Sequence, residues 1–183
     1  MVGRPRTARV LASLVASMTI GAIVLLALDS RPLPAGAFSL ASYSRLNVID
    51  EIMPARVALS PDRWNCIEVY YSRTTGGNLA QLASLSGLAS AKDVNFHFVI
   101  YNGRGGEDGR IESTEKWLQQ WSCIPGGSWY GTGTTIRICI VADGQKVLPT
   151  DCQLKRTAAL VEELSHKFNI SPANIHYPSN WQL

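Results

Sequence analysis

Three segments rich in apolar, β-branched and aromatic residues predict the strands of a sheet. They are WNCIEVYYS at 64–72, VNFHFVIYNG at 94–103 and TTIRICIVAD at 134–143. The third has apolar side chains on consecutive positions, which is typical of a central strand covered on both faces. The glycine-rich stretch GRGGEDGRIES at 103–113 predicts a turn into a short strand, so that the second segment and this one form a hairpin.

Two segments have the apolar spacing of helices. In 78–91 the leucines recur on one helical face, and in 150–168 Thr150 is a candidate N-cap ahead of a second apolar stripe. The stripes are Leu79, Leu82, Leu85 and Leu88 in the first segment, and Leu154, Ala158, Val161, Leu164 and Phe168 in the second. Because strands and helices alternate, we expect an α/β fold with a central mixed β-sheet flanked by helices.

The N-terminal part has a different pattern. Residues 10–28 contain no charged side chain, and as a helix they would span roughly 28 Å, the thickness of a bilayer core. We therefore expect one N-terminal transmembrane helix. A cleaved signal peptide is the alternative, although its apolar region is normally shorter, about 7 to 15 residues.

Arginines precede this helix at positions 4, 6 and 9, which places the N-terminus in the cytoplasm. The predicted location is the cytoplasmic membrane, crossed once, with the C-terminal domain facing the periplasm or the cell exterior. Four parts follow from this pattern: a cytoplasmic basic tail at 1–9, a transmembrane anchor at 10–28, a proline-containing linker at 29–63 and a folded domain at 64–183.

Charge and cysteine content narrow the function. The formal net charge is +3, and the three arginines of the tail account for it, so the remainder is balanced. A nucleic-acid partner is therefore not expected, since such a protein concentrates basic residues on its folded face. The four cysteines permit disulfides in an exported domain, but the sequence does not choose the pairing. The sequence contains no C-x-x-C pair, so a cysteine-based zinc knuckle is not expected.

Four stretches resemble the type 2 N-acetylmuramoyl-L-alanine amidases, a family that includes the peptidoglycan recognition proteins. WNCIEVYYS is similar to the opening W-x-x-I-V-V-H-H-S strand, and FHFVIYNGRGGEDGRIESTEKW follows the Y-H-F-V-I-x-N-G hairpin of the family. TTIRICIVAD resembles the I-G-I-C-L-V-G-D strand, and LPTDCQLKRTAALVEELSHKFNISPANIHY resembles the P-T-x-x-Q helix and the strand that ends in histidine. Together they cover most of 64–177.

The resemblance implies a groove that holds one zinc ion through two histidines and a cysteine or aspartate. It implies hydrolysis of the amide between the lactyl group of muramic acid and L-alanine. Such a zinc ion polarises the carbonyl and lowers the pKa of bound water to about 7.

Most of these zinc and catalytic positions differ in this chain. Tyr70 stands where the family has its first zinc-binding histidine, and Phe96 stands where it has a tyrosine that assists the reaction. His176 matches the second ligand. The third would lie eight residues further on, beyond Leu183, and Gln182 replaces a lysine or threonine of active relatives. With two of three zinc positions lost, we expect no metal cofactor and no catalysis, with His176 as the one retained ligand position.

Other chemistry receives little support. His97 matches a family histidine that does not bind zinc, and His166 lies on the polar side of its helix. The segment 103–109 is rich in glycine but lacks the lysine and serine or threonine of a phosphate loop. Spacing does not pair the carboxylates as in a glycosidase, and Asp143 is a turn residue. The carboxylates in question are Glu68, Glu107, Asp108 and Glu112.

We therefore predict a membrane-anchored, amidase-like domain that binds peptidoglycan fragments or a cell-envelope partner. Two alternatives stay open: an active zinc amidase with a rearranged site, built from His176, His97 and a carboxylate or cysteine, and a purely structural membrane module. The predicted ligand contacts, which could equally fill the core, are Tyr70, Tyr71, His97, Asn102, Trp117 and Arg137.

Overall fold

A computed structural model describes residue 10 and residues 14–20, 48–124 and 132–181. The chain divides into two compact units, Met1–Ala37 and Phe38–Leu183. The predicted tail at 1–9 and most of the predicted anchor at 10–28 lie outside the described residues. Among the residues that are described, none belongs to a helix both long and apolar enough to cross a bilayer.

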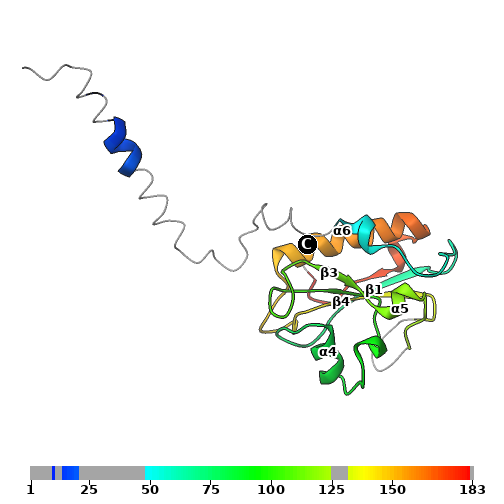
Figure 1. The fold of residues 1–183 in the computed structure, drawn as a ribbon. Coiled ribbons are helices and arrows are strands. Elements are labelled where there is room, and N and C mark those ends of the chain that lie inside the picture. The colour runs from blue at the N-terminus through cyan, green and yellow to red at the C-terminus, as the bar shows by residue number, and fades with distance from the viewer. Residues whose placement is uncertain (1–9, 11–13, 21–47, 125–131, 182–183) are drawn as a thin grey trace, which may run out of the picture. The chain divides into compact units, whose positions relative to one another are not determined.

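The second unit is built on a mixed sheet, as the sequence predicts (Figure 1). Its described strands lie in the order β3-β2-β4-β1-β5. β1 pairs in parallel with β4 and β5, β2 pairs in parallel with β4, and β2 and β3 form the predicted antiparallel hairpin. The strands are β1 (Cys66–Tyr71), β2 (Phe98–Ile100), β3 (Ile111–Ser113), β4 (Thr135–Ile140) and β5 (Ile175–His176).

β4 is the central strand, and all six of its residues are buried. This confirms the expectation drawn from its consecutive apolar positions. Helix α6 (Asp151–Phe168) covers one face of the sheet, and α4 (Leu79–Leu85) lies on the other (Figure 1). The remaining helices are short: α3 (Ile49–Ile52), α5 (Glu115–Leu118), η1 (Ala91–Asp93) and η2 (Pro172–Asn174).

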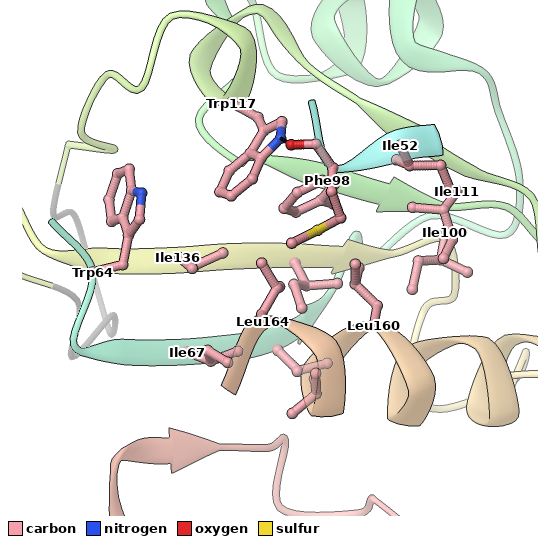
Figure 2. Close-up of a cluster of buried hydrophobic side chains, with 14 of the residues drawn as sticks. Ile52, Trp64, Ile67, Phe98, Ile100, Ile111, Trp117, Ile136, Leu160 and Leu164 are labelled. Carbon is pink, nitrogen blue, oxygen red and sulfur yellow. Dashed lines mark hydrogen bonds between the residues drawn. The ribbon is translucent and has the colours of Figure 1, made fainter. Parts of the chain in front are cut away.

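α6 begins where the sequence predicts. The hydroxyl of Thr150 accepts a hydrogen bond from the Gln153 N–H, and the Gln153 side chain bonds back to the Thr150 N–H, which is a capping box. Its apolar face packs on the sheet: Figure 2 shows Leu160 and Leu164 directed from α6 toward the strands, in the same cluster as Ile67 and Ile136. A second, smaller cluster on the opposite face of the sheet includes Leu82 of α4.

Part of the predicted linker packs on the domain. Ile52 and Met53 are buried in the same cluster as α6, and the indole N–H of Trp117 donates to the Met53 carbonyl at 3.1 Å (Figure 2). Arg56 forms an ion pair with Glu115 at 2.7 Å. The packed unit therefore starts before residue 64, because the apolar side chains of α3 complete the core, and residues 29–47 lie outside the described part.

The helix predicted at 78–91 is shorter in the structure. It ends at Leu85, because Gly87 adopts a left-handed conformation (φ 69°) and the N–H groups of Gly87 and Leu88 close the last turn. The consequence is that Leu85 is 70% exposed, where the leucine stripe predicts contact with the sheet.

Candidate functional site

The carboxyl ends of β1, β2, β4 and β5 meet at one edge of the sheet, since these strands run parallel. The segments that follow them, 72–78, 101–110, 141–147 and 177–181, lie at this edge, which we call the carboxyl edge. In open α/β sheets ligands bind at the carboxyl ends of the strands. The carboxyl edge is therefore the candidate site for a ligand.

Tyr70 lies near this edge but directs its hydroxyl inward. The hydroxyl oxygen is buried, the Tyr70 and Phe96 ring centroids are 6.3 Å apart, and Cys139 is the residue opposite Tyr70 on β4. Burial raises the pKa of the Tyr70 phenol well above its usual value, and Cys139 and Cys123 raise it further. A metal ligand must give up its proton, so this environment disfavours Tyr70 as a ligand.

The environment of Phe96 also disfavours catalysis. It is 8% exposed and belongs to the smaller apolar cluster, beside Leu82 and Val99. The chain thus has a packed hydrocarbon ring where the resemblance places a catalytic tyrosine. No proton donor stands at this position.

His97 is fully buried, and both ring nitrogens are engaged. Nδ1 accepts from the Arg137 N–H at 2.9 Å, so the proton sits on Nε2, which donates to the Trp121 carbonyl at 3.0 Å. Burial lowers the pKa of His97 to about 4, partly offset by the hydrogen bond to Trp121. The Cys123 sulfur is 3.6 Å from Nδ1. Because the lone pair of Nδ1 already accepts the hydrogen bond from the Arg137 N–H, it is not free to take the proton of the Cys123 thiol.

His176 ends the edge strand β5 and is exposed. It is in register with Glu68 of β1. β4 and β1 separate β2 from β5, and three strand spacings put the backbones near His97 and His176 about 14 Å apart. Zinc holds histidine nitrogens at about 2.0 to 2.1 Å, so the structure does not bring these two histidines together on one ion.

Metal-binding groups are scattered elsewhere as well. Within 48–124 and 132–181, no three histidine, cysteine, aspartate or glutamate side chains are grouped closely enough to hold a metal ion. The donor set near Tyr70 and His176 therefore does not fit the family's zinc ion. All four cysteines are free, and burial raises the pKa of Cys123 and of Cys139 to about 12.

An ion pair that the sequence reasoning missed lies inside the sheet. Arg137 Nε is 3.0 Å from a carboxylate oxygen of Glu68, and their side chains are 1% and 11% exposed. Arg137 also donates to the Ile124 carbonyl at 3.2 Å. The sequence does contain a signal for this ion pair. Glu68 and Arg137 are each the one charged residue of an otherwise apolar strand, and a buried charge requires a partner of opposite sign.

Apart from Tyr70, whose hydroxyl is buried, the predicted ligand contacts divide into two groups. His97, Trp117 and Arg137 have at most 1% of their surface exposed and face the interior of the structure. Tyr71 and Asn102 are partly exposed at the carboxyl edge. Direct ligand contact stays a prediction for all of these residues, and the geometry at the surface favours the last two.

Carboxylates near the edge have structural partners. Glu112 accepts a hydrogen bond from the Tyr101 hydroxyl at 2.7 Å, and Asp108 accepts one from the Thr150 hydroxyl at 2.6 Å. Asp143 accepts from the N–H groups of Gln145 and Val147, which closes a turn. These contacts assign Asp143 to a turn and Asp108 to the cap of α6, and they tie Glu112 of β3 to Tyr101.

A pocket of about 550 Å³ lies between α6, η2 and β5 and reaches the carboxyl edge only at Tyr177. Val161, Ile170 and Ile175 contribute apolar surface, and Glu162 and His166 contribute polar groups. None of the predicted site residues lines this pocket, so the carboxyl edge is the better candidate for the ligand site.

No protein-family model matches the sequence, and no curated protein matches it. Solved structures are similar to it at low identity. N-acetylmuramoyl-L-alanine amidase LysC from Clostridium intestinale is 18% identical, with 67% of this chain and 76% of that chain covered and a TM-score of 0.43. The amidase AmiD from E. coli is 19% identical, with 67% and 50% covered and a TM-score of 0.44.

A third similar structure is the peptidoglycan recognition protein PGRP-Hd from Alvinella pompejana. It is 15% identical, with 68% of this chain and 81% of that chain covered and a TM-score of 0.40. The AmiD structure is a complex with anhydro-N-acetylmuramic acid-L-Ala-D-gamma-Glu-L-Lys. All three names belong to the amidase and peptidoglycan recognition proteins that the four sequence motifs resemble.

Proposed function

We propose that this chain is a membrane-anchored, amidase-like domain without catalytic zinc that binds peptidoglycan fragments at its carboxyl edge. The four motifs between 64 and 177 support the relation to amidases. The mixed sheet that those motifs form, with open loops at the carboxyl ends of its strands, supports a ligand site there.

The observation that carries the loss of catalysis is the state of Tyr70. The resemblance places the first zinc-binding histidine at this position, and the phenol that replaces it is buried against Phe96 with a raised pKa. Zinc binding would require this phenol to ionise inside an apolar cluster, which burial opposes. Among the described residues, no three histidine, cysteine, aspartate or glutamate side chains are grouped to hold another metal ion that could lower the pKa of bound water.

The alternative of a rearranged zinc site needs His97 and His176 as shared ligands. The two engaged nitrogens of His97 and the strands between the two residues oppose this arrangement. We therefore rank a binding protein above an active enzyme.

Zinc content and muropeptide binding test the proposal together. The full chain is purified in a nonionic detergent without chelators, its zinc is quantified by mass spectrometry, and binding of N-acetylmuramoyl-L-Ala-D-γ-Glu-L-Lys is measured by calorimetry. We expect far less than one zinc per chain and a saturable binding isotherm. One zinc per chain, lost in His176→Ala, would support the rearranged enzyme instead.

A further inference from the structure

The amino ends of the parallel strands form a second edge of the sheet, opposite the carboxyl edge, which we call the amino edge. Residues 119–124, which follow α5, lie along it. The Trp121 carbonyl accepts a hydrogen bond at 3.0 Å from His97, which directly precedes β2. Asn95 and Ile124 exchange two hydrogen bonds, at 2.6 and 2.8 Å. Since β1 has six residues, the two edges are about 20 Å apart.

Arg63 holds this segment against the starts of β1 and β4. Its guanidinium group donates to the Ser122 hydroxyl at 2.7 Å, to the Gln120 carbonyl at 3.3 Å and to the Gly133 carbonyl at 3.1 Å. The side-chain oxygen of Gln120 also accepts from the Trp64 indole at 2.6 Å. These bonds fix the segment to the sheet before any partner binds.

The fixed segment presents large apolar side chains to solvent. Of its three apolar residues only Cys123 is buried, while Trp121 is 55% exposed and Ile124 is 70% exposed. Scattered exposed apolar residues are common, but two of this size on one short, rigid segment mark a surface that binds another molecule. Because the backbone is already ordered, binding there loses little conformational entropy.

Two lysines lie beside these side chains. The Lys116 carbonyl accepts from the Trp121 N–H at 2.9 Å, and Lys92 belongs to η1, which packs against α5. Within the described part of the chain, neither lysine takes part in an ion pair. Glu115, the acidic neighbour of Lys116, is paired with Arg56 at 2.7 Å and does not neutralise it. The surroundings of Trp121 therefore carry unpaired positive charge.

This combination of side chains fits the surface of a lipid bilayer. A tryptophan ring has an apolar body and a polar N–H, and it gathers at the level of the lipid headgroups. An aliphatic side chain reaches the acyl chains, and lysines attract anionic headgroups. The two lysines outweigh Asp93, the one acidic residue of η1, so the charge of this surface is complementary to anionic lipids.

The sequence also places a bilayer within reach. Residues 29–47 join the expected anchor at 10–28 to Val48, and at full extension they span at most about 65 Å. An anchored domain meets the bilayer surface continually, whereas it meets a soluble partner only by diffusion. A lipid surface is therefore the partner that the exposed side chains and the length of the chain favour together.

We propose that Trp121 and Ile124 insert into the headgroup region of an anionic phospholipid bilayer, with Lys92 and Lys116 at the lipid phosphates. The amino edge then faces the membrane, and the carboxyl edge faces away from it, where a cell-wall fragment has access. This inference goes beyond the proposed function and rests on it only for the membrane anchor.

Brominated lipids test the orientation, since bromine quenches tryptophan fluorescence only at close range. The full chain is reconstituted in vesicles of phosphatidylglycerol and phosphatidylethanolamine, with or without bromine on the acyl chains, and the fluorescence removed by bromine is measured. We expect Trp121→Phe to lose about half or more of it, because this ring lies at the lipid interface. Trp181→Phe, the matched variant at the carboxyl edge, should retain it.

Further variants test the neighbouring side chains while Trp121 reports. Ile124→Ser, and Lys92→Gln combined with Lys116→Gln, should each reduce the quenching of Trp121, because apolar contact and charge both hold the surface at the bilayer. Lys146→Gln removes one charge from an exposed lysine at the carboxyl edge and should leave the quenching unchanged. The melting temperature of each variant checks that the fold is intact.

The outcomes separate this inference from the proposed function. Equal quenching in the wild type and in Trp121→Phe would overturn the membrane face and leave muropeptide binding, measured by calorimetry, in place. Loss of muropeptide binding with the Trp121 quenching retained would overturn the proposed function alone. A wild-type chain that stays in solution beside these vesicles would overturn both the anchor and the membrane face.

Discussion

The ion pair between Glu68 and Arg137 makes a prediction at the scale of single residues. Glu68→Gln removes the negative charge and leaves the Arg137 guanidinium buried without it. Breaking a buried pair from one side costs about 3 to 5 kcal/mol, and we expect that loss in the free energy of unfolding measured with urea.

The double variant Glu68→Leu with Arg137→Met is the control. It removes both charges and replaces them with apolar side chains of similar length, so it should lose less than the single Glu68→Gln variant. A Glu68→Gln variant within about 0.5 kcal/mol of the wild type would show that the pair contributes little.

His97 makes the stability depend on pH. Its folded pKa of about 4 is below the unfolded value of about 6.5, so the unfolded chain binds more protons between these values and stability falls as the pH falls through this window. From pH 7 to pH 5 the contribution of His97 should drop by about 2 kcal/mol. Urea unfolding at the two pH values measures it.

Two matched variants isolate this contribution. His97→Gln should remove about 2 kcal/mol of the difference between pH 7 and pH 5, while His166→Gln, an exposed histidine of α6, should retain the difference. An unchanged difference in His97→Gln would contradict a buried, neutral imidazole.

Residue identity predicted part of the candidate site. Tyr70, Phe96 and His176 could be placed by motif, and Asn102 does lie at the carboxyl edge. Their environments could not be predicted, because burial of the Tyr70 hydroxyl depends on how Phe96 and Cys139 pack across neighbouring strands. The contacts of His97 with Trp121 and Arg137 depend likewise on groups far along the chain.

Among the helices and strands, the first turn of α6 allows a prediction about stability. Thr150 caps the helix and also donates to Asp108, which ties the helix to the loop after β2. Thr150→Ala removes both interactions, and we expect a loss of about 1 to 2 kcal/mol in the free energy of unfolding. Thr150→Ser keeps the hydroxyl and should lose less than half as much; equal losses would rule out the cap as the cause.

The elements themselves were predictable to different degrees. β4 and α6 follow from long, consistent patterns. α4 is shorter than its leucine spacing predicts because of one left-handed glycine. The bounds of α3 could not be predicted, because four residues give no periodicity and its contacts are with β3 and α6. Whether such short elements form, and where they end, depends on packing between segments that are distant in the sequence.

For the whole molecule, the expected anchor at 10–28 gives a testable prediction about location. We expect the full chain to stay with membranes after an alkaline carbonate wash, and a variant that lacks residues 1–28 to be released, because 19 uncharged residues insert stably. A shortened, soluble product of the wild-type chain would indicate the cleaved signal peptide instead.

We propose above that this domain binds peptidoglycan fragments without cleaving them. The most direct measurement is mass spectrometry of N-acetylmuramoyl-L-Ala-D-γ-Glu-L-Lys after incubation with the full chain and a molar excess of zinc. We expect intact ligand, because the Tyr70 hydroxyl is buried and the described part of the chain groups no three metal-binding side chains. Release of the L-Ala-D-γ-Glu-L-Lys tripeptide by the wild type, but not by His176→Ala, would contradict it.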